Sequence, residues 1–167
     1  MSQINGVVIG LVTNVSDPLN NGRIKVRFPW LDDQHETDWI RIATLMGGRN
    51  RGSFFMPEIE DEALVAFDHG DSRFPYVVGF LWNGEDAPPA DHVRLRRLQS
   101  VNGHRISFLD ATPDGGSKGA LMIEDAHGNT ISMSNGKIVI KGVGVLQILA
   151  PSVTINGRIV APNANPI

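Results

Sequence analysis

The chain has 167 residues, no cysteine and a net charge of −3. Hydrophobic residues make up 41% of it and charged residues 20%, a composition typical of a globular protein rather than a disordered one. The absence of cysteine excludes disulfides, thiolate nucleophiles and thiolate metal sites. No apolar run approaches the roughly 20 residues that cross a bilayer, and the first residues lack the basic region of a signal peptide.

The two halves of the sequence differ in charge and in core chemistry. Residues 1–88 contain 7 Lys and Arg against 13 Asp and Glu, a net charge of −6, whereas the remainder contains 8 against 5, a net charge of +3. Of the eleven aromatic residues, only Phe108 lies beyond residue 88. We therefore predict a first domain over residues 1–88, a neck or linker over 89–103 and a second domain over 104–167. The acidic balance of the first domain argues against a general phosphate-binding surface there.

The pattern of the first domain predicts a small β-barrel. Alternating apolar residues and turn formers indicate five strands and no helix. The strands are expected over residues 5–16, 22–30, 39–46, 62–67 and 74–82. Residues 32–38 and 47–52 are expected to form loops. Closure into a barrel removes exposed strand edges, and an OB fold is the smallest standard solution for five short strands.

The second domain contains a short repeat of apolar pairs at positions i and i+2, separated by Gly-containing turns. Each strand has about two inward side chains, and fully burying one gives roughly 1.5–3 kcal/mol. Ordering the backbone costs roughly 1–2 kcal/mol for every residue of the strand and its turn. The total gain from burial is therefore smaller than the total cost of ordering. Identical chains can share one core instead, and three walls form the simplest closed prism. A single-chain β-helix ranks lower because it needs longer coils. The predicted trimer core consists of Ile131, Met133, Ile138, Ile140, Leu146, Ile148, Val153 and Ile155.

Several segments resemble the phage baseplate assembly protein V family, which includes the OB-fold part of the type VI secretion VgrG proteins. In the first domain these segments are Gly10–Asn14, Gly22–Leu31, Asp38–Ala43, Arg51–Pro57 and Gly79–Gly84. Two later segments, Asn102–Phe108 and Ala126–Ser132, resemble the start of the β-helical spike that follows this OB fold. The resemblance implies an all-β chain with an N-terminal OB-fold barrel and a C-terminal trimeric β-prism or β-helix needle.

The resemblance also implies a non-enzymatic function as the central spike of a contractile tail or injection-system baseplate. Such a spike is a homotrimer that links a hub to a tip and meets the target membrane only on piercing. The implied partners are a separate hub protein at the OB end, since residue 1 already lies at the OB domain, and a PAAR-like tip protein at the C-terminal end. The resemblance further implies that the spike is assembled in the bacterial cytoplasm and belongs to a phage tail or phage-tail-like particle.

Other features of the family have no counterpart in this sequence. Some members carry a lysozyme domain between the OB fold and the needle, where this chain has only a short linker. Some end in a His-x-His motif that binds iron, whereas the last histidine here is His127. The five histidines share no metal-ligand spacing, and Asp68–Asp71 has no nucleophile beside it. We therefore expect no catalytic site, no cofactor and no metal.

Two sets of residues are candidates for docking. Arg94, Arg96 and Arg97 form a basic cluster at the neck, which either docks onto an acidic surface such as a neighbouring OB domain or is solvated. A second set near the C-terminus is expected to present backbone edges and amides to the tip protein. It consists of Arg158, Asn163, Asn165 and Ile167.

The alternative function is an OB-fold nucleic-acid-binding module with a β-rich oligomerisation tail. Arg49, Arg51, Phe54 and Phe55 provide the cations and aromatic rings on which single-stranded nucleic acid stacks. The simpler interpretation places the two aromatic residues in the barrel core and turns the arginines toward a neighbour. The domain is acidic overall, and the sequence offers no second basic and aromatic strip. We therefore expect no nucleic-acid partner.

Overall fold

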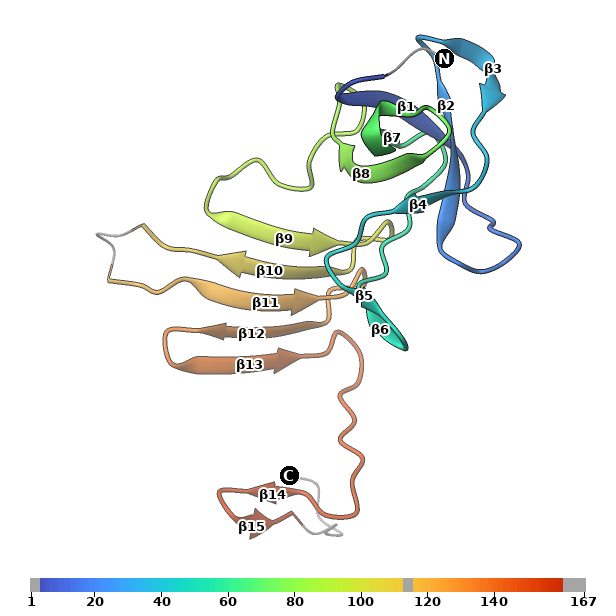
Figure 1. The fold of residues 1–167 in the computed structure, drawn as a ribbon. Helices are drawn as coiled ribbons and strands as arrows, with labels where there is room; N and C mark the ends of the chain where they lie inside the picture. Colours follow the sequence, from blue (N-terminus) through green and yellow to red (C-terminus); the bar gives the residue numbers. More distant parts are fainter. Residues whose placement is uncertain (1–3, 113–115, 161–167) are drawn as a thin grey trace. The chain divides into compact units, whose positions relative to one another are not determined.

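The structure is a computed structural model that describes residues 4–112 and 116–160 (Figure 1). The chain divides into two compact units, Met1–Ala87 and Pro88–Ile167. The regular elements of the described residues are β-strands, apart from a single 3-10 turn at Asp68–Gly70, so the predicted all-β class is confirmed. No helix in these ranges is long and apolar enough to cross a membrane.

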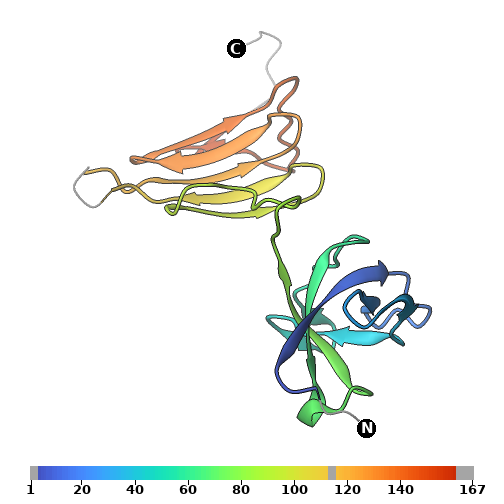
Figure 2. The ribbon, with the colours of Figure 1, turned by 90° about the horizontal axis from the view of Figure 1, so that it is seen from above.

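The first unit is a barrel closed by five strands (Figure 2). These strands are β1 (Val7–Asn14), β2 (Arg23–Phe28), β4 (Ile40–Ile42), β7 (Glu62–Phe67) and β8 (Pro75–Leu81). Their order is β1-β7-β8-β4-β2, and an antiparallel β1–β2 pair closes the ring. The β4–β8 pair is parallel. This closed five-stranded barrel is consistent with the predicted OB fold.

Alternation along the strands builds the barrel core. In β7 the side chains of Ala63, Val65 and Phe67 are buried, and those between them are half-buried. The other buried members come from the remaining barrel strands: Val12, Ile24, Val26, Ile40 and Val77. Gly10 allows β1 to cross β2 closely, because a Cβ atom there would lie 2.3 Å from Val26 Cγ1.

Two segments of the first unit that were predicted to be loops contain strands. Asp32–Glu36 forms β3, which pairs only with β2 at the edge of the sheet, where a polar sequence is tolerated. Gly47–Gly48 (β5) and Arg51–Gly52 (β6) pair as a small hairpin. The strand predicted over residues 39–46 ends at Ile42, because the chain then turns out of the barrel into this hairpin.

The second unit contains a five-stranded antiparallel sheet of order β13-β12-β11-β10-β9. Its strands are β9 (Leu95–Gln99), β10 (Arg105–Leu109), β11 (Ala120–Glu124), β12 (Thr130–Ser134) and β13 (Lys137–Lys141). Strand β9 lies within the residues predicted as neck. Its sequence, LRRLQ, does not alternate, so it carries no period-two signal.

A separate hairpin follows, with strands β14 (Thr154–Ile155) and β15 (Arg158–Ile159). The turns Asn135-Gly136 and Asn156-Gly157 both have positive φ at their two residues, as two-residue type I′ hairpins require. The strand predicted at Leu146 and Ile148 is wrong, because residues 142–153 form no strand in this chain. An isolated extended segment has no partner for its backbone hydrogen bonds within one chain.

Candidate interaction surfaces

The five-stranded sheet of the second unit has one strongly apolar face. Alternate residues of each strand point to the same side, and the strand registers align them in two rows across the sheet. The first row consists of Leu98, Ile106, Ile123, Ile131 and Ile140, and the second of Arg96, Phe108, Leu121, Met133 and Ile138. We refer to the nine apolar members of these rows as the apolar face.

The apolar face is open in the single chain. Eight of its nine side chains are exposed by 36% to 68%. On the opposite side of the sheet the polar Ser107 is buried and Ser132 is half-buried. Soluble proteins rarely leave a contiguous apolar surface of this kind uncovered unless it binds a partner. Four of the residues predicted as trimer core lie on this face: Ile131, Met133, Ile138 and Ile140.

The other predicted core and tip residues lie beyond the sheet. Leu146 and Ile148 are exposed in the irregular segment after β13. Val153 accepts a hydrogen bond from the backbone of Val160 at 2.8 Å, next to β14, where Ile155 is exposed. The predicted tip residue Arg158 is exposed in β15. Three predicted tip residues lie outside the described residues: Asn163, Asn165 and Ile167.

The three neck arginines are engaged within their own unit. Arg97 donates from Nε to Ser107 Oγ at 3.0 Å, on the side of the sheet opposite the apolar face. Arg94 donates from Nη1 to the carbonyl oxygen of Ala111 at 3.0 Å. Arg96 forms an ion pair with the aspartate that follows β10. Their docking onto a neighbour therefore stays a prediction, and it would have to replace these contacts.

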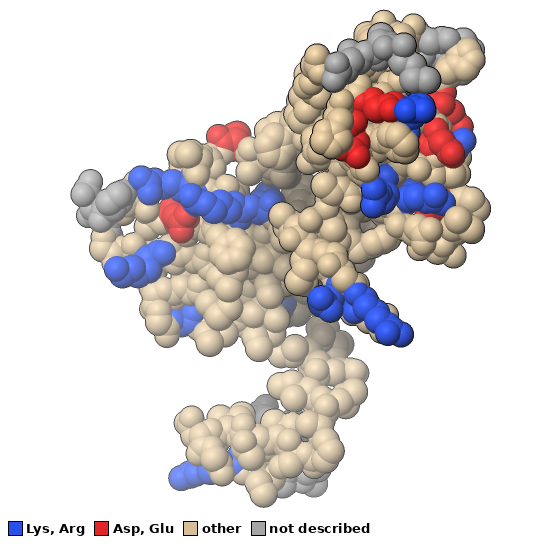
Figure 3. All heavy atoms as spheres, in the orientation of Figure 1, with Lys and Arg blue, Asp and Glu red and all other residues tan. Residues whose placement is uncertain are grey.

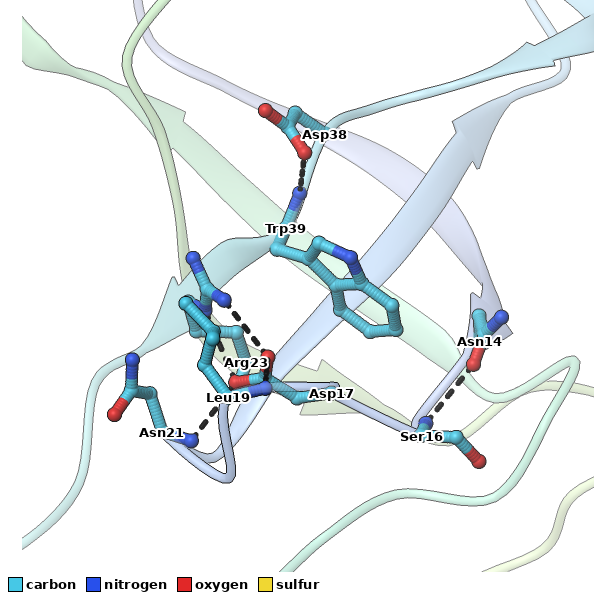
Figure 4. Close-up of polar contacts among 8 residues, drawn as sticks. All are labelled: Asn14, Ser16, Asp17, Leu19, Asn21, Arg23, Asp38 and Trp39. Carbon is cyan, nitrogen blue, oxygen red and sulfur yellow. Dashed lines mark hydrogen bonds and ion pairs between the residues drawn. The ribbon is translucent and has the colours of Figure 1, made fainter.

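The loop between β1 and β2 is organised by the carboxylate of Asp17 (Figure 4). It accepts backbone hydrogen bonds from Leu19 at 3.1 Å and Asn21 at 2.9 Å, and the Arg23 guanidinium lies 2.7 Å away. The Arg23 hydrogen bond, helped by the backbone donors, holds the pKa of Asp17 well below its ordinary value. Sequence analysis assigned no role to this carboxylate.

Three cations lie over aromatic rings on the outside of the barrel. The pairs are Lys25 with Trp39 at 5.4 Å, Arg41 with Tyr76 at 4.8 Å and Arg73 with Phe74 at 5.6 Å, measured to the ring centroids. Sequence analysis found no second basic and aromatic strip and missed this one. The partners in two of the pairs are far apart in the chain, and barrel closure brings them together.

Two of these cations are already paired with carboxylates. Lys25 Nζ lies 2.6 Å from Glu36 Oε1, and Arg73 Nη2 lies 2.6 Å from Asp71 Oδ2. The hydrogen bond from Arg73, with help from its backbone amide, lowers the pKa of Asp71 to about 2. The strip therefore has less free positive charge than its composition indicates.

A second apolar surface lies on the barrel beside the β5–β6 hairpin. A groove of about 470 Å³ is lined by the ends of β4 and β8 and by residues 53–56. Leu45, Phe54 and Phe55 are exposed by 94%, 78% and 65%. The interpretation that Phe54 and Phe55 belong to the barrel core is therefore wrong. Residues 53–56 follow an irregular path outside the strands, and Met56, the last of them, packs against the core.

The described ranges contain no group of three His, Asp or Glu side chains that could hold a metal ion. His104 uses its Nδ1 atom to accept a hydrogen bond from the backbone of Ala126 at 3.3 Å. His127 lies 3.9 Å from the Asp125 carboxylate. These two histidines therefore have local structural contacts at the turns of the sheet.

Known proteins share the first unit of this chain. Residues 8–82 match the family model of the type VI secretion system/phage-baseplate injector OB domain. The chain is 32% identical to the type VI secretion system spike protein VgrG5 of Pseudomonas aeruginosa over 111 residues, which cover 64% of this chain and 13% of the relative. It is 36% identical to VgrG1a of the same species over 74 residues, 41% of this chain and 11% of the relative.

A toxin is also similar to part of this chain. The actin cross-linking toxin VgrG1 of Vibrio cholerae is 29% identical over 102 residues, 54% of this chain and 9% of the toxin. The chain thus spans about a tenth of the length of these curated relatives. The family match coincides with the barrel, which runs from Val7 in β1 to Leu81 in β8. Residues 8–82 thus resemble the injector OB domain of type VI secretion systems and phage baseplates, and the relatives VgrG5 and VgrG1a are spike proteins by name.

Proposed function

We propose that this chain is the structural subunit of a trimeric spike at the centre of a contractile tail or injection-system baseplate. The observation that carries the proposal is the apolar face of the second unit, which one chain leaves open. In the proposed trimer three such faces surround a common axis and form the needle. The function is mechanical, and no catalytic step is assigned to the chain.

The energetics favour assembly through this face. Fully burying a large apolar side chain gives roughly 1.5–3 kcal/mol, and nine such residues per copy line the apolar face. The outer sides of β9 and β13 pair with no strand within the described ranges. Two sheets stacked face to face would leave all these edges open, whereas in a three-walled prism each edge meets the edge of a neighbour. The exposed Leu146 and Ile148 would be covered in the same assembly.

The remaining partners follow from the relatives, which are spike proteins by name. We propose that the OB unit docks a hub protein and that residues from Arg158 onward dock a PAAR-like tip protein. The assembled spike would belong to a phage tail or a phage-tail-like particle, form in the bacterial cytoplasm and meet a target membrane on piercing. Deleting residues 161–167 should abolish co-purification with the tip protein and leave the trimer intact. Loss of the trimer instead would assign these residues to its core.

The oligomeric state provides the direct test. Light scattering of the full chain at micromolar concentration should give about three times the 18.2 kDa of one copy. Because three interleaved chains must separate together, the trimer should also survive heating or SDS treatment that dissociates ordinary oligomers. A monomeric mass at micromolar concentration contradicts the proposal.

A second candidate function is binding of single-stranded nucleic acid at the outside of the barrel. The cations over Trp39, Tyr76 and Phe74 favour it, since OB folds use such positions to stack bases. The carboxylates paired with Lys25 and Arg73 oppose it, because they cancel charge that a phosphate backbone needs. A titration with labelled oligonucleotides at low salt distinguishes the two functions. A titration that shows no binding excludes the nucleic-acid-binding function.

A further inference from the structure

We propose that in the assembled trimer the OB units also contact one another, head to tail, through two different surfaces of the barrel. One is the hairpin surface, formed by Leu45, Arg49, Arg51, Phe54 and Phe55. The other is the acidic edge, formed by Glu58–Glu62, Glu85 and Asp86. The hairpin surface of each copy binds the acidic edge of the next. This inference rests on the proposed trimer and adds a second ring of contacts that the apolar face does not require.

The hairpin surface is basic, apolar and held in shape. Arg49 and Arg51 are exposed, and neither forms an ion pair within the described ranges. Figure 3 shows a group of Lys and Arg atoms at the place where Figure 1 labels the β5–β6 hairpin. The Ser53 amide donates to the Met46 carbonyl at 3.0 Å and fixes the base of the hairpin. The Arg51 guanidinium lies over the backbone of Gly48, where a Cβ atom would be 2.8 Å from Arg51 Cζ.

The acidic edge has the opposite character. It borders a hollow of about 530 Å³, lined by the start of β7 and by residues 83–86. Six carboxylates lie along it, and the described residues supply one ion pair, from Arg27 to Glu60 at 2.7 Å. The amide of Asn83 donates to both Glu62 and Asp86, at 3.1 and 3.2 Å, and so holds two like charges close together. Ile59, exposed by 57%, supplies an apolar contact within the edge.

A ring of three requires a head-to-tail contact, and charge favours pairing the hairpin surface with the acidic edge. Residues 1–88 carry a net charge of −6, so neighbouring OB units repel one another unless opposite charges face each other. A contact between two hairpin surfaces would bring four arginines together, and a contact between two acidic edges would bring twelve carboxylates together. Like charges placed opposite one another disfavour a contact. Pairing the hairpin surface with the acidic edge places opposite charges against each other and buries the exposed aromatic rings against Ile59.

The positions of the two surfaces suit a ring of three. In a three-fold ring each copy fills a sector of about 120°, so its two contact surfaces must lie on adjacent flanks rather than on opposite sides. Both surfaces flank the end of β8. Val78 and Phe80 line the groove beside the hairpin surface, and Asn83–Asp86, directly after β8, line the acidic hollow. The chain leaves the OB unit just after this ridge, at Ala87, where three chains that enter a common spike converge.

Cross-linking of the full chain tests the contact, and the absence of native cysteine makes introduced cysteines specific reporters. The doubly substituted chain Leu45→Cys/Ile59→Cys is treated with a short bis-maleimide and resolved on a denaturing gel. We expect a covalent trimer, because each copy is linked to the next around the ring. The matched control is Ser72→Cys/Ile59→Cys, since Ser72 is exposed in the loop at the other end of β7. It should give roughly tenfold less covalent trimer.

Charge reversal in the cross-linking chain tests the chemistry of the contact. Arg49→Glu with Arg51→Glu should lower the yield of covalent trimer about tenfold, because it places acids opposite acids. Adding Glu58→Arg and Glu85→Arg should restore the yield, since the pairing is then inverted. Both glutamates are exposed, and their carboxylates form no ion pair within the described ranges. Failure of this rescue overturns the assignment of the two surfaces to each other.

The native mass of each variant, measured in parallel, separates this inference from the proposed function. A trimeric mass without covalent trimer overturns the contact between OB units and leaves the spike intact. A monomeric mass overturns both. Cross-linking that stops at pairs, or that is equally strong in the Ser72 control, also overturns the inference, because a closed head-to-tail ring must link three copies through these surfaces alone.

Discussion

Ile131 lies directly opposite Ile140 across the β12–β13 pair, yet the two side chains are 39% and 55% exposed. On the reverse side of the same strands, Ser132 lies opposite Val139 and both are half-buried. The more apolar side of the sheet is thus the more exposed one in a single chain. Since burial of apolar surface is the main favourable term in folding and association, this inversion is the physical basis for the proposed trimer.

Ile131→Asp should dissociate the trimer. In the proposed assembly the substitution places a carboxylate from each copy near the axis, and burying an unpaired charge costs several kcal/mol. Light scattering should then give the mass of one copy, while circular dichroism still reports β-structure. The matched control is Thr130→Asp, one residue earlier and on the reverse side of the sheet, which should leave the trimeric mass unchanged. A trimeric mass for Ile131→Asp would exclude the apolar face as the interface.

The strands that the sequence predicts well are those with strict alternation and a buried partner. In residues 62–67 every second side chain is buried, and in residues 23–28 Ile24 and Val26 are buried while Phe28 is half-buried, so the period of two is visible in the sequence. Strand β3 at the sheet edge and the β5–β6 hairpin lack that signal, because edge strands and tight hairpins need not bury one side. The segment around Leu146 has the signal but forms no strand, because it pairs with no other strand of the described residues.

The candidate surfaces were predictable to a different extent. The apolar residues of the second unit are visible as pairs in the sequence, although the sheet that aligns them depends on the registers. The cation over Tyr76 was not predictable, because Arg41 meets that ring only through the parallel β4–β8 pair. The sequence also cannot show that Phe54 and Phe55 lie outside the core, since aromatic residues near strands are usually buried.

Asp17→Asn should destabilise the OB unit at neutral pH by weakening the loop between β1 and β2. The pKa of Asp17 in the folded chain lies well below the value of about 3.9 of an unfolded chain. The folded state therefore binds this proton less readily, so the stabilisation is complete above about pH 5 and is lost as the pH falls below about 4. Urea midpoints at pH 7, 5 and 3 measure the effect.

The difference between the native chain and Asp17→Asn should therefore shrink at pH 3. The control Asp68→Asn alters an exposed carboxylate of the same unit that lies outside both proposed contact surfaces, and it should not change the midpoint at pH 7. A difference from Asp17→Asn that grows as the pH falls would show that the carboxylate does not stabilise the loop as an anion.

Gly10→Ala should destabilise the barrel, whereas Gly79→Ala should be nearly neutral. An added methyl group at Gly10 would lie 2.3 Å from Val26 Cγ1 and 2.9 Å from the Arg27 carbonyl oxygen, while at Gly79 nothing lies within 4 Å. Overpacking of this kind costs about 1–3 kcal/mol. Denaturant unfolding of the two variants at one protein concentration measures the free energy of unfolding. Equal values would show that β1 and β2 can move apart at no cost.

Gly119→Ala should destabilise the second unit more than Gly103→Ala does, which separates steric clash from backbone strain. Both glycines have a positive φ, of 84° and 87°, so an alanine pays the same conformational cost of roughly 1–2 kcal/mol at either position. Only at Gly119 would the new Cβ atom also clash, 1.8 Å from the Leu109 carbonyl oxygen, whereas nothing lies within 4 Å at Gly103. Thermal unfolding at a fixed protein concentration should therefore give the lower midpoint for Gly119→Ala. Equal midpoints would mean that β10 and β11 separate freely beside this residue, contrary to the close approach of their backbones.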